Sequence, residues 1–155
     1  MRLSDFIVRE AVITSLVANT KEGVIRELVA SLQNSGRIQP GDADEIVRAI
    51  LKREMLGSTA ISRGVAIPHA KHGSIKRLIG TIGIHNAGVG FDSKDGAPVN
   101  VIVMIVSPED RPGDHLRALD SVSRALRNET FVGQIRAAGN LETINQLIDS
   151  PGILG

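Results

Sequence analysis

The segment from Val99 to Val106, which is apolar at every position except Asn100, constrains the fold more than any other part of the sequence. Side chains of a β-strand alternate between two faces, so a strand that is apolar on both faces needs cover on both sides. The turn signal Asp95-Gly96 stands shortly before it and is typical of a chain reversal into a strand. The segment therefore predicts the central strand of a sheet that lies between two layers of helices. It is far shorter than the ~20 apolar residues that span a bilayer.

Helix and strand signals alternate along the chain, which indicates an α/β domain. The other predicted strands are Val12–Leu16, Ala60–Ile61 continuing to Val65–Ile67, and Ile79–Ile84. A first helix is predicted after Thr20, a typical N-cap residue, and it ends at Gly36. A second helix is predicted from Asp42 to about Met55, because Asp42 and Glu45 have a spacing close to that of a capping box.

Three further helices are predicted near the C-terminus. Asp114 is expected to cap the first of them, whose apolar positions are Leu116, Leu119, Val122 and Leu126. The second spans roughly Glu129 to Ala138, and the third follows Asn140 and ends before Pro151. A chain of 155 residues is enough for about one domain. This domain is predicted over residues 1–150, with residues 151–155 as a flexible tail.

Charge and composition exclude several classes of function. The chain has 18 basic and 17 acidic side chains, a net charge of +1, and no Tyr or Trp on which bases could stack, so no nucleic-acid partner is expected. The absence of cysteine excludes disulfides and thiolate-bound metals, and it fits a reducing compartment. The N-terminus Met1–Asp5 opens no apolar stretch of signal-peptide length. We therefore expect a cytoplasmic protein without direct membrane insertion.

The segment from Arg53 to Lys71, REMLGSTAISRGVAIPHAK, contains the residues best suited to chemistry. Pro68 lacks an N–H and is expected to end strand pairing and to fix the backbone that carries His69. Imidazole is partly neutral near pH 7, so one ring nitrogen of His69 can act as a nucleophile, and a phosphohistidine can pass its phosphoryl group onward. Arg53 matches phosphate oxygens with a planar guanidinium group, and the hydroxyls of Ser58 and Thr59 can add donors.

This segment resembles the enzyme IIA proteins of the bacterial phosphotransferase system, in the mannitol/fructose/nitrogen-regulatory family. The family's helix-ending RE pair, its LGST turn and its GVAIPHA segment stand here as Arg53-Glu54, Leu56–Thr59 and Gly64–Ala70. The likeness continues in Gly90-Phe91-Asp92, Pro98-Val99 and His115-Leu116, and it extends from Leu3-Ser4-Asp5 to about Ile148. The resemblance implies a mixed, mostly parallel central sheet flanked by helices on both sides, the mannitol-type enzyme IIA fold.

The resemblance also implies roles for individual residues. His69 would accept the phosphoryl group, on the outer (tele) nitrogen of its ring. The histidine of the family's HL pair lies beside the acceptor, and here that residue is His115. If Asp114 is the N-cap, His115 lies in a first helical turn, where unpaired N–H groups favour an anion. Arg53 would neutralise charge on the transferring group, with Ser58 and Thr59 as secondary phosphate-binding residues.

The same residues also have simpler interpretations. Arg53 could be a solvated residue at a helix C-terminus, and His115 a polar residue at a helix start. His72 and His69 have a spacing that can hold a metal on a helix, but Pro68 and Gly73 argue against a helix there. Neither a metal nor a cofactor is therefore expected. Two other hypotheses stay open: a regulatory binding module in which His69 is not phosphorylated, and a metal-dependent hydrolase that uses His69, His72 and His115.

The function implied by the resemblance is that of a phosphocarrier in the phosphoenolpyruvate-dependent phosphotransferase system. The donor would be HPr or a nitrogen-branch homologue of HPr, and the recipient a IIB domain or a regulated protein. Leu3-Ser4-Asp5 and Phe91-Asp92 favour the nitrogen-regulatory branch, and a free-standing fructose- or mannitol-specific IIA is the alternative. Arg63 stands in a loop where many family members have small residues, so it is expected to alter phosphate affinity or the docking surface.

Overall fold

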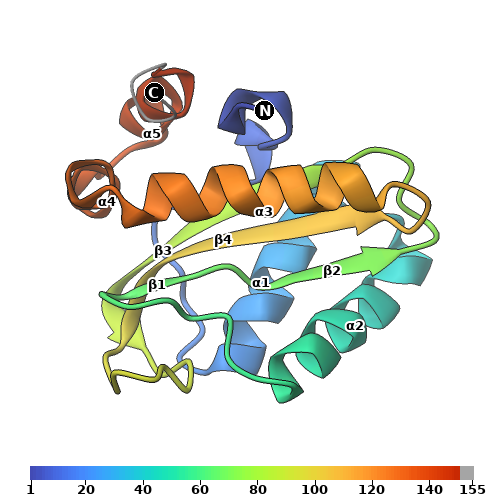
Figure 1. The fold of residues 1–155 in the computed structure, drawn as a ribbon, viewed down its shortest axis with the longest axis horizontal. Coiled ribbons are helices and arrows are strands. Elements are labelled where there is room, and N and C mark those ends of the chain that lie inside the picture. The colour runs from blue at the N-terminus through green and yellow to red at the C-terminus, as the bar shows by residue number, and fades with distance from the viewer. Residues whose placement is uncertain (151–155) are drawn as a thin grey trace.

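The central strand of the sheet is the apolar segment identified from the sequence. The computed structural model describes residues 1–150 and contains a four-stranded sheet of β1 (Val65–Ala66), β2 (His69–His72), β3 (Ile79–Val89) and β4 (Val99–Pro108) (Figure 1). β4 pairs in parallel with β1 and β2 along one edge and antiparallel with β3 along the other. The prediction of a mixed, mostly parallel sheet around this strand is confirmed.

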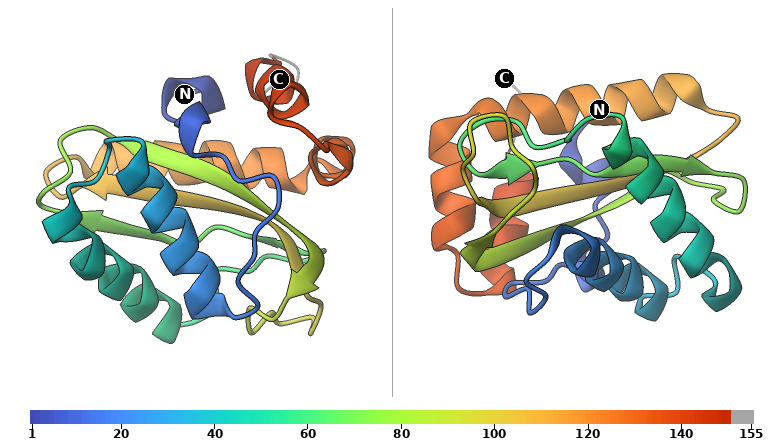
Figure 2. Two further views of the ribbon diagram at one scale, coloured as in Figure 1. Left: turned by 180° about the vertical axis from the view of Figure 1, so that it is seen from behind. Right: turned by 90° about the horizontal axis from the view of Figure 1, so that it is seen from below.

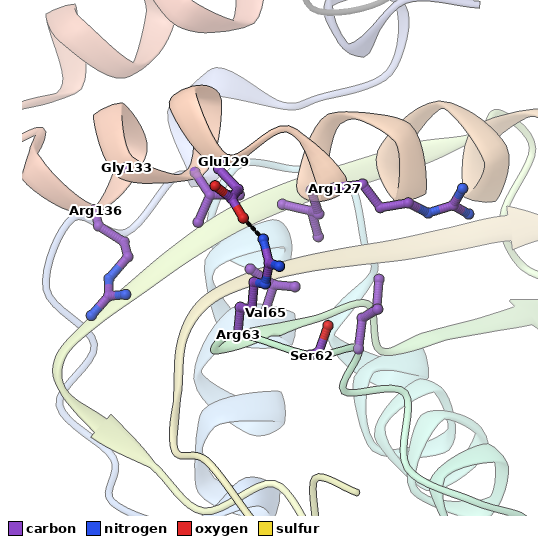
Figure 3. A pocket seen from close by; sticks show the side chains of 10 residues that line it. Ser62, Arg63, Val65, Arg127, Glu129, Gly133 and Arg136 are labelled. Atoms are coloured by element: carbon purple, nitrogen blue, oxygen red, sulfur yellow. Dashed lines mark ion pairs between the residues drawn. The ribbon is translucent and has the colours of Figure 1, made fainter. Parts of the chain in front are cut away.

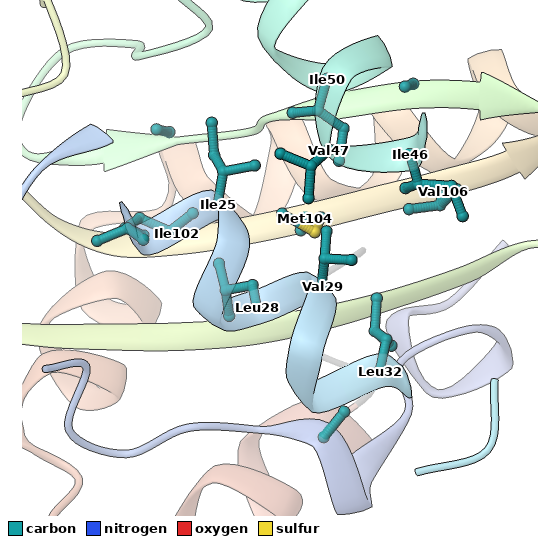
Figure 4. Close-up of a cluster of buried hydrophobic side chains, with 14 of the residues drawn as sticks. Ile25, Leu28, Val29, Leu32, Ile46, Val47, Ile50, Ile102, Met104 and Val106 are labelled. Atoms are coloured by element: carbon teal, nitrogen blue, oxygen red, sulfur yellow. The ribbon is translucent and has the colours of Figure 1, made fainter. Parts of the chain in front are cut away.

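Helices cover both faces of the sheet, as the two-sided apolar pattern of β4 requires. α1 (Lys21–Asn34) and α2 (Ala43–Met55) lie on one face, and α3 (Pro112–Arg127), α4 (Glu129–Ala137) and α5 (Leu141–Asp149) lie on the other (Figures 1 and 2). Ile102, Met104 and Val106 of β4 pack with α1 and α2 (Figure 4). The residues between them, Val101, Val103 and Ile105, pack with α3, α4 and α5 on the opposite face. One strand therefore contributes to two separate hydrophobic clusters.

Three helices have a side-chain cap at their N-terminus, and the cap at Thr20 is one that the sequence predicts. Thr20 Oγ1 accepts a hydrogen bond from Gly23 N at 3.0 Å at the start of α1. Asn140 Oδ1 accepts from Thr143 N at 2.8 Å at the start of α5, and Asn128 caps α4 in the same way. These short polar side chains satisfy N–H groups that have no partner within the helix.

At two other helix starts the predicted cap is not formed. α2 begins after Asp42, as predicted. The side chain of Asp42 makes no capping bond, because a 3-10 turn at Pro40–Asp42 precedes α2 and holds Asp42 itself in a helical conformation. α3 begins at Pro112 rather than after Asp114, with Arg111 as the N-cap, since proline is favoured in the first turn of a helix. Asp114 lies within that first turn.

The predicted strand Val12–Leu16 is also wrong, although the segment does run along β3. It forms only one isolated bridge, from Ile13 to Gly83, and a second bridge joins Ile7, earlier in the chain, to Gly80. Six positions separate Ile7 from Ile13, whereas three separate Gly80 from Gly83, so the extra residues buckle into a 3-10 turn at Arg9–Ala11. A second 3-10 turn, Leu3–Asp5, opens the chain. A regular ladder cannot form across this mismatch.

Pro68 separates two strands instead of ending the pairing altogether. β1 ends at Ala66, and β2 begins at His69, where it resumes parallel pairing with β4 opposite Ile105. His69 therefore opens a strand, although the sequence predicted that strand pairing ends at Pro68. In residues 1–150, none of the helices combines the length and the apolarity needed to cross a bilayer. The predicted tail at residues 151–155 lies outside the described residues.

Candidate functional site

Two histidines that are far apart in the sequence meet at one point of the fold. His69 is the first residue of β2, and His115 is the fourth residue of α3 (Figure 1). Their ring centroids lie 5.5 Å apart, and the ring planes are tilted by 56°. The His115 side chain is buried, and His69 is half-buried. The structure thus brings together the two histidines that the sequence singled out.

A backbone carbonyl fixes the orientation of the His69 ring. Nδ1 of His69 lies 2.7 Å from the carbonyl oxygen of Ile67. A carbonyl can only accept, so Nδ1 must carry the proton and donate it, which leaves the outer nitrogen Nε2 with its lone pair. The turn at Ile67-Pro68 therefore selects the tautomer that has its nucleophilic atom on the outer side of the ring.

The surroundings of His69 keep its ring neutral. Burial lowers the pKa of His69, and the positive charge of Arg53 lowers it further, while the Ile67 carbonyl and Glu54 act in the opposite direction. At neutral pH the ring is therefore mainly the free base. A neutral imidazole with a fixed Nδ1–H is suited to nucleophilic attack through Nε2.

His115 is held by a buried serine that the sequence analysis missed. Nδ1 of His115 lies 2.6 Å from the Oγ of Ser107, a residue of β4 that is fully buried. The signal in the sequence was the hydroxyl that directly follows the apolar run, in a strand predicted to be covered on both sides. Burial lowers the pKa of His115 to about 4, and His69, when it is protonated, and Lys71 act in the same direction. His115 is therefore neutral near pH 7.

Arg53 lies in the last turn of α2, close enough to His69 for its charge to lower the His69 pKa. Its Nη1 donates to the carbonyl oxygen of Gly57 at 2.9 Å, which ties the guanidinium group to the turn after the helix. Among the described residues, no ion pair engages Arg53, so its remaining N–H groups are available to an anion. The structure thus places the arginine near His69.

The hydroxyls of Ser58 and Thr59 are used within the turn itself. Ser58 Oγ donates to the carbonyl oxygen of Phe91 at 2.6 Å. Thr59 Oγ1 donates to the buried carboxylate of Glu54, which also pairs with Lys21 Nζ at 2.7 Å. These contacts hold the turn between α2 and β1 in place. A direct contact of Ser58 or Thr59 with phosphate stays a prediction.

His72 lies on the other side of the strand from His69. Residues three apart in a strand face opposite sides, and His72 accordingly contacts Glu45 of α2, with Nε2 3.0 Å from the carboxylate. The hypothetical metal set of His69, His72 and His115 is therefore not assembled. Within residues 1–150 no group of three or more His, Cys, Asp or Glu side chains has the arrangement of a metal site.

Large apolar side chains close in sequence to Arg53 and to His115 are exposed. Met55 and Leu56, next to Arg53, are 85% and 83% exposed, and Leu116, next to His115, is 66% exposed. Leu116 was expected on the apolar face of its helix, which begins three residues earlier than predicted. Its buried face runs instead through His115, Ala118, Val122 and Ala125. Exposed apolar side chains next to polar site residues are typical of a docking surface.

Comparisons with known proteins show the family of this chain. Residues 5–150 match the model of the family described as "Phosphoenolpyruvate-dependent sugar phosphotransferase system, EIIA 2". A nitrogen regulatory protein of Bradyrhizobium diazoefficiens is 30% identical over 151 residues, which are 97% of this chain and 97% of the relative. A fructose-specific EIIABC component of Bacillus subtilis is 32% identical over 96% of this chain, which spans only 23% of that longer relative.

The fold is shared with a solved structure of similar size. The crystal structure of nitrogen regulatory protein IIA-Ntr from Neisseria meningitidis superposes with a TM-score of 0.84 at 24% sequence identity. The match covers 94% of this chain and 98% of that chain. Identity at this level supports the fold alone, and the fold is the one that the sequence resemblance implied.

Proposed function

Because this chain belongs to the EIIA 2 family of the phosphoenolpyruvate-dependent sugar phosphotransferase system, we propose that it is a phosphocarrier with His69 as its phosphoryl acceptor. The donor would be a phosphorylated HPr or a nitrogen-branch homologue of HPr. The observation that carries the proposal is the hydrogen bond from His69 Nδ1 to the Ile67 carbonyl, 2.7 Å long, because it leaves Nε2 as the nucleophile. This is the outer nitrogen expected from the family resemblance.

In the proposed step the lone pair of His69 Nε2 forms a bond to phosphorus while the N–P bond of the donor phosphohistidine breaks. The electron pair of that bond returns to the donor nitrogen. The proton on Nδ1 stays hydrogen-bonded to Ile67 during the transfer, so no separate base is needed. Onward transfer to a IIB domain is the same exchange in reverse, with His69 as the leaving group.

Neighbouring side chains would stabilise the transferring group by charge and hydrogen bonding. Phosphoryl transfer depends mainly on positioning and on electrostatic stabilisation of the phosphoryl oxygens. Arg53 supplies a positive charge, and His115 supplies a ring whose centroid is 5.5 Å from that of His69. Met55, Leu56 and Leu116 would form the apolar part of the surface on which donor and recipient dock.

We favour the nitrogen-regulatory branch, in which phosphorylation of His69 serves as a signal. The relative from Bradyrhizobium diazoefficiens, which matches this chain almost from end to end, is named a nitrogen regulatory protein. The alternative is sugar uptake, with delivery of the phosphoryl group to a fructose- or mannitol-specific IIB domain. The similarity to the fructose-specific EIIABC component of Bacillus subtilis supports that second function.

Phosphorylation with labelled phosphoenolpyruvate, enzyme I and HPr, or their nitrogen-branch homologues, tests the proposal. The wild-type protein should gain an acid-labile, alkali-stable label, and His69→Ala should gain none. His72→Ala is the matched control, because His72 lies on the same strand but faces Glu45, and it should be labelled like the wild type. Label on His69→Ala would show that the acceptor is another residue. An unlabelled wild type would instead favour the unphosphorylated binding module.

A further inference from the structure

A cavity of about 420 Å³ lies apart from the paired histidines, where the loop before β1 meets the end of α3 and the start of α4 (Figure 3). Its volume falls within the roughly 300–1,000 Å³ typical of small-molecule sites. Its lining residues are Ile61, Ser62, Arg63, Val65, Leu126, Arg127, Glu129, Val132, Gly133 and Arg136. His69, His115 and Arg53 are not among them, so the proposed phosphocarrier chemistry does not account for this cavity.

The cavity and His115 lie toward opposite ends of α3. His115 is in the first turns of that helix, whereas Leu126 and Arg127 are its last residues. At a rise of 1.5 Å per residue, the eleven positions between His115 and Leu126 correspond to roughly 16 Å along the helix axis. A small ligand in the cavity would therefore not touch the phosphoryl group on His69.

The floor of the cavity is apolar and firmly packed. Val65, Leu126 and Val132 line it and are themselves buried in the hydrophobic cluster beneath α3 and α4. Ile61, which is partly buried against the same cluster, adds to this surface. A floor of this kind can bury a small apolar group without a rearrangement of the protein.

The rim of the cavity carries three arginines and one carboxylate. Arg63 reaches across to Glu129 and pairs with it, and Arg136 reaches the cavity from the last turn of α4 (Figure 3). Arg127 turns along α3, where it donates to Ser123 Oγ at 2.7 Å. In the part of the chain that the structure describes, Glu129 is the only acidic group paired with these arginines. The rim therefore has an excess of positive charge.

Arg63 is held over the cavity by an unusual backbone conformation. Its φ angle is +66°, in the left-handed region that side chains other than glycine rarely adopt, and the next residue, Gly64, has a φ of +80°. The N–H of Arg63 donates to Asp95 Oδ2 at 3.2 Å, which stabilises this turn. Unfavourable backbone conformations persist where the surrounding structure enforces them, often at ligand sites. The backbone conformation of Arg63 is therefore a second indication of a ligand site, separate from the charge on the rim.

We propose that this cavity binds a small organic phosphate, with its phosphate group at the arginine rim and its apolar part on the floor of Val65, Leu126 and Val132. Guanidinium groups bind phosphate oxygens through paired, charge-assisted hydrogen bonds. A phosphate would take the place of the Glu129 carboxylate as the partner of Arg63. The chain has no Tyr or Trp, and no Phe lines the cavity, so a ligand with a compact apolar group fits better than a stacked base.

Phenyl phosphate is the probe that tests the proposal, with inorganic phosphate and phenol as its two halves. Binding is measured by NMR titration of the backbone amides of Val65, Val132 and Gly133, which report on the cavity rather than on His69. Phenyl phosphate should bind at least about 10-fold more tightly than either half, because only it uses both the rim and the floor. Equal binding of phenyl phosphate and inorganic phosphate would overturn the proposed use of the floor.

Charge variants give effects of opposite sign. Arg136→Gln and Arg63→Gln should each weaken binding about 5- to 10-fold, because each removes one charge-assisted contact at an exposed rim. Glu129→Gln should tighten binding several-fold, because it removes the competitor for Arg63. Arg124→Gln is the matched control: it removes the same charge from α3, but Arg124 pairs with Asp120 outside the cavity. An Arg124→Gln effect as large as that of Arg136→Gln would overturn the proposal.

A space-filling variant completes the test. Apart from the neighbouring residues and the local backbone of α4, no heavy atom lies within 4 Å of the position that a Cβ at Gly133 would take, so Gly133→Leu can be accommodated while its side chain fills the open space. This variant should lose phenyl phosphate binding while its melting temperature stays at or above that of the wild type. Gln134→Leu, on the next position of the helix and outside the cavity, is the control. Unchanged binding to Gly133→Leu would contradict the proposed site.

Discussion

At the scale of single residues, the two histidines are oriented by partners on their Nδ1 atoms. A backbone carbonyl accepts a hydrogen bond from Nδ1–H of His69, and a serine hydroxyl lies against Nδ1 of His115. The sequence predicts His69 and His115 because their motifs are local. It does not predict the Ile67 carbonyl or the Ser107 hydroxyl as partners, because those contacts depend on the backbone path at Pro68 and on the packing of α3 against β4.

His115 and Arg53 should assist phosphoryl transfer without being acceptors. Loss of one such group in a shielded site typically raises the barrier by about 2–4 kcal/mol, or roughly 10²–10³ in rate, and solvent access should keep the effect near the lower end. Ser107→Ala should slow transfer less, by about 10-fold, because Ser107 acts through the orientation of His115. Quench-flow measurement of uptake by His69 and of delivery to a IIB acceptor checks these rates.

A control and a structural readout separate orientation from stability in this experiment. Ser121→Ala removes a different buried hydroxyl, one that lies on α3 and donates to the Met1 carbonyl, and it should leave the transfer rates unchanged. The ¹⁵N shifts of the His115 ring should change in Ser107→Ala and not in Ser121→Ala. Wild-type rates and ring shifts in Ser107→Ala would remove Ser107 from the site.

At the scale of elements, the sequence predicts types better than boundaries. The central strand and all five α-helices are confirmed, because each carries an apolar periodicity of its own. The failures fall where pairing depends on distant residues. Whether Val12–Leu16 forms a strand depends on its register with β3, and the start of α3 depends on Pro112 rather than on the more obvious Asp114.

Gly80 shows how closely the elements approach, because β3 there runs between β4 and the N-terminal segment. A Cβ at Gly80 would lie 2.8 Å from the carbonyl oxygen of Met104 and 3.2 Å from the Phe6 ring. Gly80→Ala should therefore lower the free energy of unfolding by about 2–3 kcal/mol, since the backbone of β4 cannot move aside cheaply. Urea denaturation monitored by circular dichroism measures this loss.

Gly133→Ala is the matched control for the same chemical change. Gly133 lies inside α4 with open space around the new methyl group, so alanine should raise the free energy of unfolding by up to about 1 kcal/mol. The two substitutions should thus have opposite signs. A Gly80→Ala protein as stable as the wild type would show that β3 and β4 can separate more easily than the contacts indicate.

At the scale of the whole molecule, the buried site makes stability depend on pH. The pKa of His115 is lowered to about 4 by burial, whereas an unfolded chain has a histidine pKa near 6.5. Between these values the unfolded chain binds more protons than the folded protein, so stability rises with pH across this window. This contribution to the free energy of unfolding is complete above about pH 6.5. It is lost as the pH falls toward 4, and the total loss is at most about 3 kcal/mol.

Comparison of wild type and His115→Gln isolates this contribution. The wild type should lose more of its unfolding free energy between pH 7 and pH 4.5 than His115→Gln does, because the variant has no group at position 115 that titrates there. Urea denaturation at both values measures the difference. Equal losses in the two proteins would show that the His115 ring is not protected from protonation in the folded state.

The central position of β4 should determine which backbone amides exchange most slowly with deuterium. β4 is bonded along both edges and packed on both faces, so its amides can reach deuterium only when both hydrophobic clusters open together. β1 is two residues long, and the N-terminal segment touches β3 at isolated bridges, so these parts can fray alone. The slowest-exchanging amides would thus lie directly beneath the two histidines. When a protein partner docks around His69, the β4 strand beneath the site should therefore stay intact unless the whole domain unfolds.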